Sequence, residues 1–182
     1  MRTAPALLIV LAATLALVGC VPDDDPIVLD PDPSVSPIFE SDEEALAAAE
    51  AAYAEYSSVS SNILMEGGQN PDRIEPFVSP DILQNQLDGF SLYSDAGWHI
   101  SGPSTFDSFV LQQHLEESDV ATVVVYLCVD VSSARVLDAS GTDVTPIGRE
   151  DRVPLEVEVA FANSDSWLIS RTERWGGDDF CV

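Results

Sequence analysis

The sequence contains no lysine and few basic residues of any kind. Its 32 aspartate and glutamate residues stand against 7 basic residues, all of them arginine, and the formal net charge is −25. A surface of this sign repels phosphate backbones and anionic lipid headgroups. The composition therefore argues against nucleic acid or a bare membrane surface as a partner.

The sequence also lacks the short motifs that carry common catalytic and metal chemistry. It has no glycine-rich phosphate loop, no nucleophile elbow and no zinc-ligand spacing. The aspartate clusters at 23–25 and 178–179 do not have the spacing of a calcium loop. We therefore expect neither a cofactor nor a bound metal.

An apolar run at residues 4–18 follows Arg2 and leads into Leu17-Val18-Gly19-Cys20. The run is shorter than the about 20 residues of a comfortable membrane span, but it suits the apolar part of a secretory signal. The arrangement resembles the lipobox of bacterial lipoproteins. The resemblance implies that residues 1–19 are a lipoprotein signal peptide and that Cys20 becomes the lipidated first residue. Two acyl chains would then hold the protein on the extracytoplasmic face of the cell membrane. The alternatives are an ordinary cleaved signal with a chance cysteine and an uncleaved anchor.

Residues 20–40 have the composition of a tether. Five prolines alternate with aspartates from Pro22 to Pro37, and both proline stiffness and like-charge repulsion favour an extended chain. Roughly 20 residues at about 3.1 Å each would reach about 60 Å. We expect this segment to hold the following domain, residues 41–182, away from the membrane.

The sequence has only 3 cysteines, and lipidation of Cys20 leaves Cys128 and Cys181. An even pair in an oxidising compartment predicts a disulfide. The bridge would close a loop of roughly 50 residues and contribute about 4 kcal/mol in the chain-entropy model. The alternatives, two free thiols or a metal-binding pair, lack nearby histidine or cysteine ligands.

Helical patterns fill the first half of the domain. Ser41-Asp42-Glu43-Glu44 has the form of a capping box, and Gly67-Gly68 is a helix stop. Asn70-Pro71 and Ser79-Pro80 each predict an N-cap followed by the first residue of a further helix. The buried stripe of the first helix is predicted to comprise Leu46, Ala49, Tyr53, Tyr56, Ser60 and Ile63.

Alternating patterns fill the second half. Strands are predicted at 105–115, 120–131, 155–161 and 166–175, with two short extended runs joined by a turn at 138–141. Both faces of 120–131 are partly apolar, so this strand should be central. The fold class is therefore α+β, with three N-terminal helices packed on a four- or five-stranded antiparallel sheet. A curved sheet of this kind would wrap the first helix and leave a cone open at one end.

This order of elements resembles the nuclear-transport-factor-like, or SnoaL-like, cone fold, which is also described as cystatin-like. The chain is similar in particular to secreted and lipid-anchored members in high-GC Gram-positive bacteria. The resemblance covers roughly residues 41–182 and rests on 128–132, 135–144, 152–153, 167–169 and Cys181. It implies a cone whose enzymatic members carry Asp, His or Tyr inside, although no such enzyme motif matches this sequence residue by residue.

Three residues are candidates for catalysis in such a cone. His99 and His114, the only 2 histidines, are candidate general bases, and Asp130 is a candidate buried acid with a raised pKa. The structural alternatives are surface or hydrogen-bonded histidines and an aspartate that caps a turn at a strand end. The candidate pocket residues are Tyr53, Tyr56, Trp98 and Tyr126, for which the alternative is ordinary core packing.

We expect a lipid-anchored envelope protein that binds a small apolar ligand or a partner protein without catalysis. One alternative is a SnoaL-like isomerase, dehydratase or hydrolase acting on a small hydrophobic substrate. Another is a structural envelope lipoprotein with a filled core. An open cavity would favour ligand binding or catalysis, whereas a cone plugged by side chains would favour an interaction surface.

Overall fold

The computed structural model describes residues 36–117 and 119–181. The predicted signal peptide, the lipidation residue Cys20 and most of the tether lie outside these residues. Val35–Val182 form one compact unit, and that unit contains the whole described core. Of the helices in this part of the chain, none combines the length and the apolar character that crossing a membrane takes.

The first helix, α1 (Asp42–Met65), starts at the predicted capping residues. The Ser41 hydroxyl accepts a hydrogen bond from the Glu44 backbone N–H at 3.2 Å, and the Glu44 carboxylate accepts one from the Glu40 N–H at 2.8 Å. The helix ends as Gly68 N–H donates to Ile63 at 2.8 Å. Gly68 has a positive φ, and a Cβ there would lie 2.2 Å from the carbonyl oxygen of Phe90, in the helix α2 (Pro80–Ala96). Glycine is therefore required at this position.

Two further helical segments follow, η1 (Pro71–Phe77) and α2 (Pro80–Ala96). The predicted N-cap positions are confirmed, because Asn70 and Ser79 each stand directly before the proline that begins the helical segment. Asn70 is left-handed, with φ 50°, and neither its side chain nor that of Ser79 makes a capping hydrogen bond. The first segment is a 3₁₀ helix that contains Pro76, which has no N–H to continue an α-helical ladder.

Four strands form one antiparallel sheet in the order β2 (Thr105–Glu117), β3 (Val120–Asp130), β5 (Arg152–Asn163) and β6 (Ser166–Arg174). The strand predicted at 120–131 is β3. Its predicted central position is confirmed, because it pairs with β2 and β5 along its length. β1 (His99–Ser101) and β4 (Arg135–Leu137) form a separate two-stranded ribbon. Of the two extended runs predicted around the turn at 138–141, only the first is a strand.

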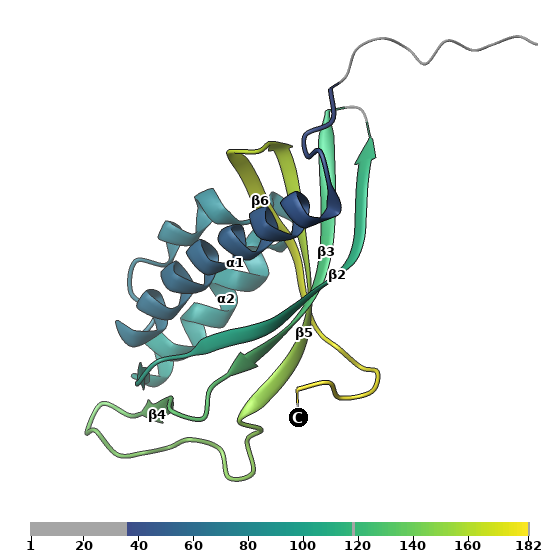
Figure 1. Ribbon diagram of the computed structural model, residues 1–182. Coiled ribbons are helices and arrows are strands. Elements are labelled where there is room, and N and C mark those ends of the chain that lie inside the picture. Colours follow the sequence, from purple (N-terminus) through teal and green to yellow (C-terminus); the bar gives the residue numbers. More distant parts are fainter. Residues whose placement is uncertain (1–35, 118, 182) are drawn as a thin grey trace, which may run out of the picture. The chain divides into compact units, whose positions relative to one another are not determined.

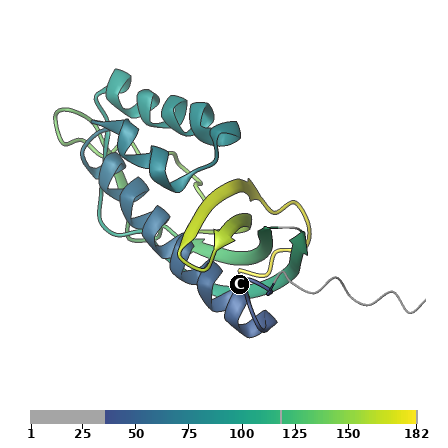
Figure 2. The same cartoon turned by 90° about the horizontal axis from the view of Figure 1, so that it is seen from above.

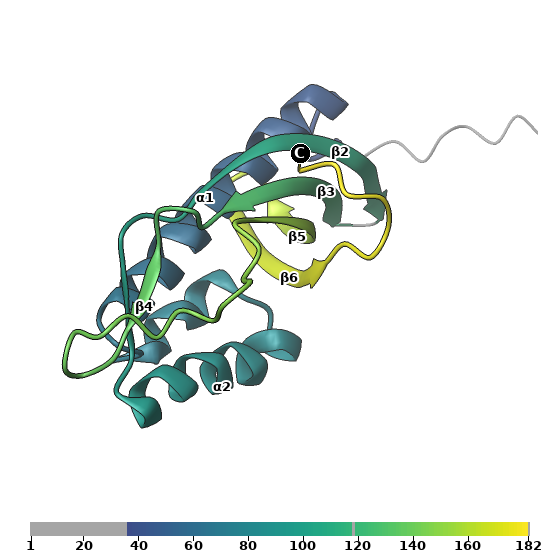
Figure 3. The same ribbon diagram turned by 90° about the horizontal axis from the view of Figure 1, so that it is seen from below.

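The helices pack on the sheet to give an α+β fold (Figure 1). Figures 2 and 3 show that the strands follow an arc rather than a flat plane. The described core joins α1 to the inner faces of β3 and β5. Of the predicted stripe on α1, Ala49, Tyr53, Tyr56 and Ile63 are buried, whereas Leu46 and Ser60 are only partly buried.

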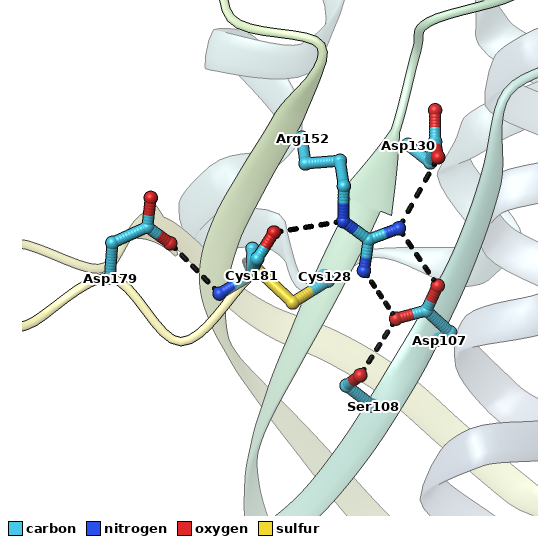
Figure 4. Close-up of a disulfide and its surroundings, with 7 residues drawn as sticks. All are labelled: Asp107, Ser108, Cys128, Asp130, Arg152, Asp179 and Cys181. Atoms are coloured by element: carbon cyan, nitrogen blue, oxygen red, sulfur yellow. Dashed lines mark hydrogen bonds and ion pairs between the residues drawn. A yellow bond between two sulfur atoms is a disulfide. The ribbon is translucent and has the colours of Figure 1, made fainter.

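The C-terminal segment covers the opposite face of the sheet. The predicted disulfide is confirmed: Cys128 on β3 is bonded to Cys181, and both residues are buried (Figure 4). Tyr126, on the same face as Cys128, packs against Trp175 and Phe180, with ring centroids 4.5 and 5.6 Å away. The tail thus shields an apolar strip of the sheet from water.

Arg152 on β5 ties three strands and the tail together (Figure 4). Its guanidinium donates to both carboxylate oxygens of Asp107 on β2, at 2.8 and 3.0 Å, and to Asp130 on β3 at 3.2 Å. Its Nε donates to the Cys181 carbonyl oxygen at 2.9 Å. Arg152, and then Ser108, lower the pKa of Asp107. Hydrogen bonds from Ser132, and then from Arg152, lower that of Asp130.

Removal of the disulfide should destabilise the domain strongly. The bridge joins residues 53 apart in sequence, and a loop of this size corresponds to about 4 kcal/mol in the chain-entropy model. We expect residues 35–182 with Cys128→Ala and Cys181→Ala to unfold at a much lower urea concentration than the oxidised parent. The reduced parent should match the double variant; equal midpoints for the oxidised and reduced parent would contradict the stabilising role.

Replacement of Arg152 should change the pH dependence of stability. The pKa values of Asp107 and Asp130 are lower in the folded state than in the unfolded state. The two carboxylates therefore contribute their full share of the folding stability at pH values above their unfolded-state pKa. This contribution is lost as the pH falls below about 4. In urea unfolding, the difference between the parent and Arg152→Gln should therefore be largest at neutral pH and shrink in acid. The control is Arg174→Gln, which makes the same charge change at an exposed pair with Glu150. A difference that is constant with pH, or that matches the control, would contradict the assignment.

Candidate functional site

A cavity of about 1030 Å³ lies between α1 and one end of the sheet. The C-terminal half of α1 forms one wall, from Tyr53 to Met65. The ends of β3 and β5 form the wall opposite, and the segment from Trp98 to Phe106 closes one side. The chain between β4 and β5 contributes the remaining side, including Arg149. Residues that are distant in the sequence therefore meet around one space.

The two main walls differ in chemistry. The sheet wall is apolar and includes Val129, Val153 and Leu155. The helix wall carries neutral polar groups from Ser57, Ser58, Ser60, Ser61 and Asn62. The site can thus enclose an apolar molecule and offer hydroxyl and amide groups along one side of it, a combination typical of small-molecule pockets.

Three of the four predicted pocket residues line this cavity: Tyr53, Tyr56 and Trp98. Burial raises the pKa of Tyr53 and of Tyr56, so both phenols stay protonated at neutral pH. The Tyr56 hydroxyl donates to Gln86 of α2 at 3.0 Å. The ring of Tyr56 therefore faces the cavity while its hydroxyl fixes α1 to α2.

The prediction for Tyr126 is wrong. Tyr126 belongs to the outer face of the sheet, where it packs on Trp175 and Phe180. Side chains alternate along a strand, so Tyr126 shares a face with Cys128 and not with the cavity-lining Val129. The aromatic cluster on that face holds the C-terminal segment in place and has no part in the cavity.

Neither histidine lies in the cavity lining. His99 lines a separate hollow of about 300 Å³, next to Trp98 and the end of α1. His114 on β2 lies beside the start of α1, with Nδ1 3.0 Å from an Asp42 oxygen and Nε2 3.1 Å from a Glu116 oxygen. The predicted placement of both as bases inside the cone is wrong, and the hydrogen-bonded alternative describes His114.

The prediction for Asp130 is wrong in position and in the direction of its pKa. A buried catalytic acid would have a raised pKa, but hydrogen bonding by Ser132 and Arg152 lowers that of Asp130. Its carboxylate accepts a hydrogen bond from the Ser132 backbone N–H at 2.9 Å. This is the alternative of an aspartate that caps the turn at a strand end.

Arg149 is a cavity residue that the sequence analysis missed. Its Nη2 donates to the carbonyl oxygens of Val131 at 2.7 Å and Ala134 at 3.0 Å, and lies 3.5 Å from an Asp151 oxygen. It belongs to no motif. The only signal in the sequence is the rarity of cations, which makes each of the 7 arginines worth locating.

The described lining contains no Asp, Glu or His. Its chemistry is that of apolar packing, neutral hydrogen bonding and one guanidinium. The arrangement can bind and orient a molecule. The residues predicted for general acid–base catalysis, His99, His114 and Asp130, lie outside this lining.

No protein-family model and no curated protein sequence matches the chain. Among solved structures, it is similar to the crystal structure of the intermembrane space region of the chloroplast protein ARC6, with a TM-score of 0.53 and 15% sequence identity. That match covers 72% of this chain and 97% of the other. A solution NMR structure of a de novo designed β-sheet protein matches at 14% identity with a TM-score of 0.28, over 77% of this chain and 94% of the other. At such identities the ARC6 likeness shows the fold alone, and the second match carries no argument.

Proposed function

We propose that this protein is a lipid-anchored, extracytoplasmic binding protein that holds a small apolar molecule in the cavity between α1 and the sheet. The observation that carries the proposal is the cavity itself. Its volume of about 1030 Å³ lies just above the range for small-molecule sites, about 300–1,000 Å³. A structural lipoprotein with a filled core would have no reason to keep such a space.

The chemistry of the walls supports binding of an apolar molecule. Val129, Val153 and Leu155 present branched side chains that bury apolar surface well, and removal of that surface from water is the main source of affinity. The serine hydroxyls of α1 add neutral hydrogen-bonding groups without the desolvation cost of a charge. We propose simple binding rather than SnoaL-like catalysis because His99, His114 and Asp130 all lie outside the lining.

The finer description of the fold is part of the same proposal. We propose the nuclear-transport-factor-like cone, in which a curved sheet wraps a long helix and leaves an opening at one end. The arc of the strands in Figures 2 and 3 supports it, as does the position of the cavity at the end of α1.

The location rests on the sequence and on one structural feature. The lipobox resemblance at residues 17–20 and the tether at 20–40 suggest an anchored domain outside the cytoplasm. The Cys128–Cys181 disulfide supports this, because such bonds persist mainly in oxidising compartments.

Binding of a partner protein is the second candidate function. Four exposed apolar residues favour it. Met65, Trp98 and Val144 line the cavity and are exposed. Ile147 is fully exposed and follows the lining residue Pro146 in the sequence. Scattered exposed apolar residues are ordinary, but a group of them beside one opening is typical of an interaction site.

A variant that fills the cavity should lose ligand binding. Ser61 lines the cavity from α1, so Ser61→Phe in residues 35–182 should weaken binding of the neutral fluorophore N-phenyl-1-naphthylamine at least tenfold. The control is Ala51→Phe, at an exposed position of the same helix outside the lining. Binding is measured by fluorescence titration and folding by circular dichroism. No probe binding to the parent, or equal binding to a folded Ser61→Phe variant, would contradict the proposal.

The anchor is tested separately in cells that produce the full chain. Radiolabelled palmitate should be incorporated into the parent protein and not into Cys20→Ala. Cys128→Ala is the matched control, because it removes a cysteine of the predicted extracytoplasmic domain and should leave labelling intact. Equal labelling of the parent and Cys20→Ala would exclude lipidation at this residue.

A further inference from the structure

The charges around the cavity point to a particular class of ligand. We propose that the ligand is an amphiphile with an apolar tail and a single anionic head group, and that Arg149 binds the head group. This inference rests on the proposed binding function and adds the sign and the position of the ligand charge.

The lining of the cavity differs in charge from the rest of the chain. In the chain as a whole, 32 acidic residues face 7 arginines. Among the described residues that line the cavity the balance is reversed, because Arg149 is charged and no lining residue is acidic. A cavity for cationic molecules would favour carboxylates in its wall, and a cavity for neutral molecules would have no need of a guanidinium. An anionic group would be repelled by carboxylates in the wall and attracted by Arg149.

Backbone carbonyl groups hold Arg149 in a fixed position beside the cavity. Its Nη2 donates to the carbonyl oxygens of Val131 and Ala134, which fixes the guanidinium against the chain that follows β3. The side chain is 22% exposed. Its Nε is buried and has no hydrogen-bond partner among the described residues. A buried donor without a partner is unfavourable, so the protein does not fully satisfy the guanidinium.

Two carboxylates, Asp151 and Asp143, compete for the charge of Arg149. Hydrogen bonds from Thr145, and then the charges of Arg135 and Arg149, lower the pKa of Asp143, and its carboxylate lies 3.8 Å from Arg135. An Asp151 oxygen lies 3.5 Å from Nη2 of Arg149, and the Asp151 side chain is largely exposed. Exposed ion pairs are weakened by water and salt and are worth little. Asp151 therefore leaves Arg149 able to bind a second anion, and a planar guanidinium has enough donors to contact both.

Tyr93 lies near the same end of the cavity. It lines the cavity with Arg149 and Trp98, and its ring lies 6.2 Å from that of Trp98. Burial raises the pKa of Tyr93, and the nearby charge of Arg149 opposes that rise. Tyr93 thus stays protonated at neutral pH and can donate its hydroxyl proton to a head group beside Arg149. The apolar wall of Val129, Val153 and Leu155 remains for the tail.

The test compares four ligands that share one tail. Dodecanoate, dodecyl phosphate, dodecanol and dodecylamine compete with N-phenyl-1-naphthylamine for residues 35–182, below their micelle concentrations. We expect dodecanoate, dodecyl phosphate or both to displace the probe at a concentration at least tenfold lower than dodecanol does. Dodecylamine should be the weakest competitor. Which anion is preferred identifies the head group as carboxylate or phosphate.

Variants then assign the preference to Arg149. Arg149→Gln should bring the anionic ligand to the level of dodecanol without changing dodecanol, and Arg149→Lys should keep part of the preference. Arg174→Gln is the control with the same charge change, at an exposed arginine outside the lining.

If the probe binds but the anions compete no better than dodecanol in the parent, the inference is wrong and the binding function stands. A preference that survives in folded Arg149→Gln also overturns the inference. If neither the probe nor any of the four ligands binds the parent, the proposed function itself fails.

Discussion

The architecture depends on how closely α1 can approach the sheet. In its first half the helix buries Ala45, Ala49 and Ala52, and these small side chains permit close packing. At Tyr53 the packing changes, because this ring meets Phe106 and Phe109 at centroid distances of 5.0 and 5.8 Å. Beyond Tyr56 the helix still buries Ile63 in the core, but its cavity side carries Ser57, Ser60 and Ser61, which are too small to fill the space opposite the sheet. The helix is thus packed tightly at one end and bounds a cavity at the other.

The two faces of the sheet have separate roles that depend on the alternation of side chains. Val129 and Val153 are cross-strand partners and both line the cavity. Their neighbours Cys128, Asp130 and Arg152 point to the outer face, where the disulfide and the arginine network hold the strand ends and the C-terminal segment together. The outer face therefore fixes the position of the wall that the inner face presents. The covalent and ionic bonds on the outer face stabilise the sheet, and the inner face can therefore border a cavity without being fully packed.

Much of the fold could be predicted because its determinants are local. Short stretches of sequence predict the start of α1 at Ser41 and the strand β3. The count of cysteines predicts the disulfide. Tyr126 shows a different limit. Strand alternation alone groups Tyr126 with Cys128 and separates it from Val129, and the structure shows that the face of Cys128 is the outer one. There the error was to group residues by aromatic character rather than by strand face.

The candidate site was less accessible from the sequence because its parts come together only in the folded chain. Asp130 was proposed as an acid with a raised pKa, but hydrogen bonds from Ser132, and then from Arg152 on another strand, lower its pKa instead. Arg149 sits in an irregular segment with no periodicity, and only the tertiary structure places it beside Val131 and Tyr93. A cavity is an absence of atoms between elements, and no residue pattern encodes it directly.

The central claim is that a ligand enters the space between α1 and the sheet. Amide NMR shifts of residues 35–182, recorded during titration with dodecanoate, test it most directly. We predict that the changes gather at residues 57–62, 98–106 and 129–131 and leave the outer-face residues 175–180 unaffected. Saturating changes on the outer face alone, or none anywhere at millimolar ligand, would contradict the claim.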